Sequence, residues 1–240
     1  MNLVSADSIS LGELAETFTA GYEDYFTPVR VDEPAMRFIV DSWDIDLARS
    51  RVAVEDGSRI GFANLAVRGD RAWIGGIGVV PAARRHGVGR SLMEAVLAQA
   101  PGEVTLEVIE QNEPAIRLYE SLGFARTRIL EVWSLPPVPV HEVRSVDAAP
   151  LGQEGLPWQR DDASLPADYE RFEVDGGAIL LRNGNVLQLG ARDEDAAVEL
   201  LSRGVQLQYV NVPEGDVASA ALRRLGGDLR LRQFEMQLLR

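Results

Sequence analysis

Residues 73–97 read WIGGIGVVPAARRHGVGRSLMEAVL, and this stretch decides the fold. Its apolar run from Trp73 to Val80 predicts a buried strand, which Pro81 ends because proline has no backbone N–H. From Gly87 onward the apolar residues recur at the three- and four-residue intervals of a helix face. The loop between strand and helix therefore places backbone N–H groups at a helix N-terminus, where the helix dipole favours an anionic ligand.

Two nucleotide-binding motifs do not fit this loop. The dinucleotide fingerprint G-x-G-x-x-G/A, read from Gly87 and Gly89, would need Gly or Ala where Leu92 stands. A triphosphate-binding loop needs Gly-Lys-Ser/Thr, and the sequence contains no lysine. Neither class of nucleotide site is therefore expected.

A third pattern, Q/R-x-x-G-x-G/A, is met by Arg84, Gly87 and Gly89, directly after a V-x-P at residues 79–81. Downstream, residues 104–124 read VTLEVIEQNEPAIRLYESLGF and fit N-x-x-A-x-x-L-Y-x-x-x-G-F at every specified position. In this order and spacing the two patterns resemble the signature of the GNAT superfamily of N-acetyltransferases. The resemblance covers about residues 11–133.

The resemblance implies that acetyl-CoA is the acyl donor. Its pyrophosphate is expected on the loop amides and its pantetheine arm along the strand before the loop, and no metal is expected. The residues implied to bind the cofactor are Ile77, Gly78, Val79, Arg84, Arg85, His86, Gly87, Val88, Gly89, Arg90 and Asn112.

Acetyl transfer to an amine also needs a stabilised oxyanion and a proton for the departing thiolate. The resemblance gives the first role to the N–H of Val79 and the second to Tyr119. A phenol with an ordinary pKa of about 10 can protonate a thiolate whose conjugate acid has a pKa of about 8.5. No unique base for the amine is visible. Glu107 or Glu110 could act through water, and each also fits a solvated surface carboxylate.

The composition is that of a globular protein of 240 residues with a formal net charge of −13 and no cysteine. That charge argues against nucleic acid, which is bound through Lys and Arg. No apolar run approaches the roughly 18 residues of a membrane span, and residues 1–10 carry no secretory signal. We therefore expect a cytoplasmic protein. The family resemblance implies a small-molecule or peptide amine as acceptor, and a homodimer is compatible with the sequence.

Apolar spacing predicts an amphipathic helix over residues 8–26 and a second helix after Pro34, capped by Asp32 or Glu33. In the family these two helices border the acceptor pocket. The aromatic residues that could line that pocket, although each also fits an ordinary core position, are Tyr22, Tyr25, Phe26 and Trp43.

The predicted strands and helices follow the same order twice along the chain. Strands at 51–54 and 59–67 precede the Trp73 strand, and a strand pair is expected at 125–133, before a stiff proline-rich linker. Residues 138–168 are poorly interpretable, with HEVRSV at 141–146 as a possible strand. From Tyr169 the sequence again predicts three strands, a helix, a strand, a helix and a strand pair, although an unrelated α+β appendage would also fit.

These patterns predict a mixed α/β (α+β) fold of two GNAT-like halves. Each half is expected to hold a mostly antiparallel sheet with a central V-shaped splay, flanked by helices. Residues 1–137 would form the catalytic domain, and residues 138–240 a degenerate domain that begins with the 138–168 linker.

The second half lacks the chemistry of the first. The acids at 193–195 stand at its helix start, where they would repel a pyrophosphate, and Leu222 takes the place of Tyr119. One acetyl-CoA per chain is therefore expected. The leading hypothesis is an N-acetyltransferase working by direct attack in a ternary complex. The alternative is a non-catalytic acyl-CoA-binding or regulatory module, which would need the loop but not Tyr119.

Overall fold

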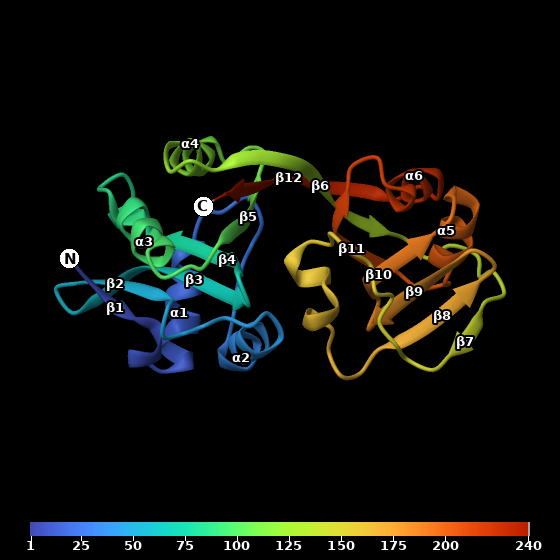
Figure 1. Cartoon of the computed structure of the whole chain (residues 1–240), viewed down its shortest axis with the longest axis horizontal. Coiled ribbons are helices and arrows are strands. Elements are labelled where there is room, and N and C mark those ends of the chain that lie inside the picture. Colours follow the sequence, from blue (N-terminus) through green and yellow to red (C-terminus); the bar gives the residue numbers. More distant parts are fainter. Residues whose placement is uncertain (240) are drawn as a thin grey trace. The chain divides into compact units, whose positions relative to one another are not determined.

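The computed structural model describes residues 1–239, which fold as two compact units (Figure 1). The first unit holds residues 1–106, residues 116–125 and the end of the described chain from Gln237. The second holds residues 107–115 and 126–236. The chain thus passes between the units within β5 (Glu103–Ile109), α4 (Glu113–Ser121) and β12 (Asp228–Leu238). The predicted domains 1–137 and 138–240 follow the sequence repeat instead, and they stay a prediction.

The strands of the first unit follow one another in the order β1-β2-β3-β4-β5. Their ladders are antiparallel, except that β4 and β5 are parallel and pair from Arg71–Glu103 to Trp73–Thr105. The residue ranges of the other elements of this unit are β1 (Asn2–Ser5), α1 (Leu11–Gly21), α2 (Glu33–Ser42), β2 (Arg51–Glu55), β3 (Ser58–Arg68), β4 (Arg71–Val79) and α3 (Val88–Leu97).

The helices of the first unit cover both faces of its strands. Gly61 and Phe62 are neighbours on β3, so they point to opposite faces. Phe62 lies in a buried apolar cluster with Leu14 of α1 and Met36 of α2. A side chain at Gly61 would meet Leu92 of α3 at 3.2 Å. Helices α1 and α2 therefore pack on one face and α3 on the other.

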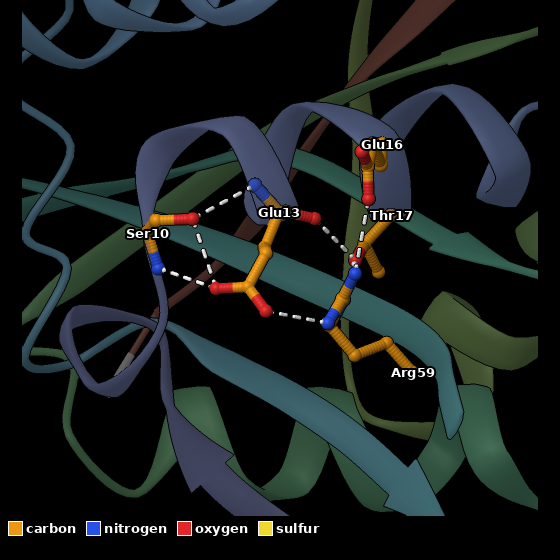
Figure 2. Close-up of polar contacts among 5 residues, drawn as sticks. All are labelled: Ser10, Glu13, Glu16, Thr17 and Arg59. Carbon is orange, nitrogen blue, oxygen red and sulfur yellow. Dashed lines mark hydrogen bonds and ion pairs between the residues drawn. The ribbon is translucent and has the colours of Figure 1, made fainter. Parts of the chain in front are cut away.

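Polar contacts fix the N-terminal part of α1 (Figure 2). Ser10 and Glu13 form a capping box, in which each side chain accepts a backbone N–H of the other residue. Arg59 of β3 donates to the Glu13 carboxylate at 2.8 Å and to the Thr17 hydroxyl at 3.1 Å. The Ser10 bonds, ahead of Arg59, hold the pKa of Glu13 below its ordinary value. The helix start is thus satisfied locally and tied to β3.

The second unit repeats the order of three antiparallel strands, a helix and a parallel strand. Its strand order is β12-β6-β11-β10-β9-β8-β7, and β10 and β11 are the parallel neighbours. Helices α5 and α6 contribute Leu200 and Leu222 to its buried core. Its remaining elements are β6 (Ala125–Leu135), β7 (Arg144–Val146), β8 (Glu170–Val174), β9 (Gly177–Arg182), β10 (Asn185–Ala191), α5 (Glu194–Leu201), β11 (Leu207–Pro213) and α6 (Val217–Arg224).

The mixed α/β fold class is confirmed, and four details of the prediction need correction. The helix predicted over 8–26 spans only Leu11–Gly21, and the four-residue strand β1 was not predicted. The strand pairs expected at 125–133 and at the chain's end are single eleven-residue strands, β6 and β12. Neither stretch contains a Gly, Pro or Asn that would turn the chain, which favours one long strand.

Candidate active site

The loop between β4 and α3 takes the shape that its glycines predicted. A short 3-10 turn over Pro81–Ala83 follows the strand, and Arg85 and Gly87 have φ values of 66° and 83°, in the left-handed region. Gly87 is the N-cap of α3, which begins at Val88. Its conformation is one that glycine adopts without strain.

This loop ends in backbone amides that have no partner within the helix. The first N–H groups of any helix have no partner within it, and here these belong to Val88, Gly89 and Arg90, since Ser91 N–H is the one that reaches Gly87 O, at 3.0 Å. Arg85, His86 and Gly87 are exposed. A side chain added at Gly87 would meet open space, with nothing within 4 Å. The residues present therefore fit a bound pyrophosphate.

Arg84 uses its side chain differently from the rest of the loop. Its Nε donates to Val79 O at 2.9 Å, and its Nη2 donates to Gly21 O at 3.5 Å and to Glu23 O. All three acceptors are backbone carbonyls: Val79 of β4, Gly21 at the end of α1, and Glu23 in the turn after that helix. The guanidinium of Arg84 is thus engaged with the protein itself.

The predicted oxyanion donor lies at the end of β4. Val80 N–H donates to Ile60 O of β3 at 3.0 Å. Because backbone groups of successive strand residues point to opposite edges, the N–H of Val79 points away from β3. Gly78 is buried, whereas Ile77 and Val79 are half-buried. Val79 can therefore present a donor on the side of β4 opposite to β3.

Tyr119 lies on α4 and is 5% exposed, with its ring centroid 6.1 Å from that of Phe124. Burial raises the pKa of Tyr119 above its ordinary value of about 10, and the nearby Tyr22 and Tyr25 raise it further. Burial also raises the pKa of Tyr22, while a hydrogen bond from the Ile77 backbone opposes that rise. Tyr119 is therefore a protonated phenol in a group of three tyrosines that reaches β4.

Three predicted residues fall in the second unit. Glu107 is half-buried on β5, and the Glu110 carboxylate lies 3.6 Å from Arg232 Nη1. Asn112 fixes the turn before α4, because its N–H donates to Ile109 O at 2.9 Å and its side chain accepts the Ala115 N–H at 3.4 Å. The structure thus brings Val79, the loop and Tyr119 into one unit, and Glu107 and Asn112 into the other.

The aromatic candidates for an acceptor pocket divide into two groups. Tyr22, Tyr25 and Phe26 form a continuous series of ring contacts, and Phe26 is 52% exposed. Trp43 packs instead edge-on against Trp73, with centroids 5.7 Å apart. The first group lies at the end of α1, beside the backbone that Arg84 contacts.

Comparison with known proteins relates part of the chain to a family. The sequence pattern of the acetyltransferase (GNAT) family matches residues 13–124. Residues 13–124 thus resemble a GNAT acetyltransferase domain. The chain is similar to the peptidyl-lysine N-acetyltransferase YiaC of Escherichia coli, with 35% identity over 77 residues, which are 32% of this chain and 50% of that protein. It is also similar to the mycothiol acetyltransferase of Thermomonospora curvata, with 31% identity over 130 residues, which are 51% of this chain and 44% of that protein.

The chain thus spans about half the length of the curated relatives that it matches. A crystal structure from Pyrococcus horikoshii superposes with a TM-score of 0.74 at 17% identity, covering 100% of this chain and 88% of that one. A GCN5-related N-acetyltransferase from Sphaerobacter thermophilus superposes with a TM-score of 0.66 at 17% identity, covering 98% and 93%. These two structures share the fold. The family match and the two curated relatives support the predicted acyltransferase.

Part of the site was not visible in the sequence pattern. The glycines, Pro81 and Tyr119 stood in recognisable motifs, but nothing local pairs Arg84 with the end of α1, more than 60 positions earlier. The residue of α1 that accepts from Arg84 is Gly21, which lies outside the family motif. Among residues 1–239, no helix is long and apolar enough to span a membrane.

Proposed function

We propose that the protein is an acetyl-CoA-dependent N-acetyltransferase that acts on a primary amine of a small molecule or a peptide. The observation that carries the proposal is one unit that holds both an exposed glycine loop at the start of α3 and the buried, protonated Tyr119. The loop suits an anion and the phenol suits a leaving thiolate. The relatives named above are a peptidyl-lysine N-acetyltransferase and a mycothiol acetyltransferase, and the first of these names supports an amine acceptor.

The proposed chemistry is direct attack in a ternary complex. The acceptor nitrogen bonds to the thioester carbonyl carbon, while the N–H of Val79 donates to the carbonyl oxygen as it becomes negative. The carbon–sulfur bond then breaks, and Tyr119 gives its proton to the sulfur. The proton lost by the nitrogen goes to water. Bulk water can return a proton to Tyr119.

The second half completes the proposal as a degenerate copy with no cofactor site of its own. Only two residues separate β10 from α5, whereas eight separate β4 from α3. Asp193 caps α5 by accepting the Ala196 N–H at 3.0 Å, so the helix start is already filled by a carboxylate. That bond, ahead of Arg192, lowers the pKa of Asp193, which keeps the side chain negative. We therefore expect each chain to bind one acetyl-CoA. We also propose that this half can join two chains in a homodimer.

The alternative is a non-catalytic acyl-CoA-binding module, and release of free CoA separates the two. Mixing the full chain with acetyl-CoA and a panel of amines and peptides with free α- or ε-amino groups should liberate free thiol, detectable with a chromogenic disulfide reagent. At least one acceptor should raise the rate well above hydrolysis alone. Tight acetyl-CoA binding with no thiol release on any acceptor would favour the binding module.

A further inference from the structure

We infer that Arg84 is a positioning residue that fastens the acceptor side of the site to the cofactor strand, rather than a ligand of the cofactor phosphates. The expected effect on catalysis rests on the proposed function, whereas the contacts of Arg84 do not depend on it. Its three acceptors, Val79 O, Gly21 O and Glu23 O, join the end of β4 to the segment after α1.

The chemistry of this contact is that of a helix C-terminus. The last carbonyls of a helix lack partners within it and carry the negative end of the helix dipole. A guanidinium can bond several such oxygens at once because its donors form a rigid fork. Arg84 thus satisfies the Gly21 carbonyl at the end of α1 and the Glu23 carbonyl just beyond it, while its Nε holds Val79, the residue proposed to bind the oxyanion.

Two further contacts hold the same junction. A side chain added at Gly21 would come within 3.0 Å of the backbone of Gly78, and one added at Gly78 would come within 3.0 Å of the backbone of Gly21. The two backbones can therefore touch only because both residues are glycine. Between Gly21 and Glu23, Tyr22 bonds to the Ile77 backbone. The aromatic series from Tyr22 to Phe26 follows directly, so a shift of this junction would move residues that border the proposed acceptor pocket.

The variant Arg84→Ala tests the inference through a split between the two substrates. It should raise KM for the acceptor, or lower kcat, so that kcat/KM for the acceptor falls by about 10-fold to 100-fold, as expected for misplaced reacting groups. The Kd for acetyl-CoA should change by less than about threefold, since the loop amides remain. Arg84→Lys should recover part of the loss, because an ammonium can bond one or two of the carbonyls but lacks the fork.

The matched control is Arg59→Ala, which removes the arginine that ties α1 to β3 near its other end. It should lower the melting temperature without changing either substrate constant. Amide hydrogen exchange over residues 21–30 gives a readout independent of turnover, and Arg84→Ala should speed it. Loss of acetyl-CoA affinity with unchanged exchange would overturn the inference and make Arg84 a phosphate ligand. Absence of turnover in the wild-type chain would instead contradict the proposed function, while the hydrogen-exchange test of Arg84 would still apply.

A second inference stands on different residues: we infer that residues 151–162, here the plug segment, fill the strand splay of the second unit as a built-in occupant. The parallel strands β10 and β11 pair only at Asn185–Gln208 and Val186–Tyr209 within the described ladder. Beyond these pairs, polar groups of both strands bond to the plug segment instead of to each other.

The β10 side of the splay is held by Gln188, which is fully buried. Its Nε2 donates to Arg160 O at 2.8 Å and to the Asp162 carboxylate at 2.6 Å, and its Oε1 accepts the Leu151 N–H at 3.1 Å. The next carbonyl, Leu189 O, accepts from Gln153 at 3.3 Å. The plug segment thus satisfies the buried Gln188 side chain and the Leu189 carbonyl of β10.

The β11 side is held by Arg160, which is 5% exposed. Its Nη1 donates to Asn211 O at 2.9 Å, its Nη2 donates to the Tyr209 hydroxyl, and its guanidinium carbon lies 4.5 Å from the centre of the Tyr209 ring. Since its own carbonyl bonds to Gln188, Arg160 joins both strands. An acyl-CoA arm could enter this splay only by displacing these contacts.

Arg160→Ala should therefore loosen the second unit, with a melting temperature lower by several degrees and faster hydrogen exchange across residues 185–191 and 207–213. The control Arg230→Ala removes an exposed arginine of the same unit, paired with Asp228, and should change neither. If Arg160→Ala fails to fold, the milder Gln153→Ala should show the same exchange pattern. Unchanged exchange over both strands in either folded variant would overturn the inference.

Discussion

Gly87→Glu should abolish detectable acetyl-CoA binding while leaving the chain folded. The substitution places a carboxylate on the exposed loop, next to the amides of Val88 and Gly89 that are proposed to hold the pyrophosphate. Charge-assisted hydrogen bonds contribute about 1.5–3 kcal/mol each, so losing two of them weakens binding by about a hundredfold or more. Calorimetric titration of wild type and variant, with a thermal melt of each, measures both effects.

The chain supplies a close control for this variant in Gly215. Gly215 shares with Gly87 a φ of +83° and open space around the added side chain, but it lies in the second unit. Gly215→Glu therefore introduces the same backbone strain and the same charge away from the proposed site. It should bind acetyl-CoA like wild type. Wild-type affinity in Gly87→Glu would remove the loop from the mechanism, and equal losses in both variants would point to strain alone.

Tyr119→Phe should lower turnover by about 10²–10⁴ with nearly unchanged acetyl-CoA affinity, because it removes a proton donor and little volume. The variant Tyr22→Phe tests whether the neighbouring tyrosine could be the proton donor instead, since the pKa of the Tyr22 hydroxyl is also raised. We expect it to lower turnover by less than about tenfold. A larger effect at Tyr22 than at Tyr119 would exchange their roles, and a loss below about threefold at Tyr119 would leave protonation to solvent.

The pH profile checks the same assignment. A general acid works only while it is protonated, so its contribution is present below its pKa and lost above it. Since burial raises the pKa of Tyr119 above its ordinary value of about 10, kcat should not decline on the alkaline side up to about pH 10. A decline with a midpoint near pH 8 in wild type, absent from Tyr119→Phe, would show a phenol with a lowered pKa instead.

The sequence was informative where a local rule sets the backbone. Pro81 ends β4 and Gly87 caps α3 because each residue type restricts or permits particular backbone angles, and both positions were predicted. The Asn-Gly turn at residues 183 and 184 joins β9 to β10 for the same reason. The errors at β6 and β12 came from expecting a turn that no residue supplies.

The remainder depends on contacts between distant positions, which no local pattern encodes. Gly21 and Gly78 look like ordinary glycines of a helix and a strand until the fold brings their backbones together. The stretch that holds Trp158 and Arg160 has no periodicity, yet both residues are buried. The hydrogen-bond partners of Arg160 lie about 50 positions downstream. The family motif marks Arg84 but does not show where its side chain goes.

The most direct test of the account is the stoichiometry of acetyl-CoA binding to the full 240-residue chain, measured by calorimetric titration. We expect one site per chain, because the loop before α3 offers free amides, whereas the start of α5 is capped by Asp193 and the plug segment fills the neighbouring splay. Two equivalent sites per chain, or one site that survives Gly87→Glu, would contradict it.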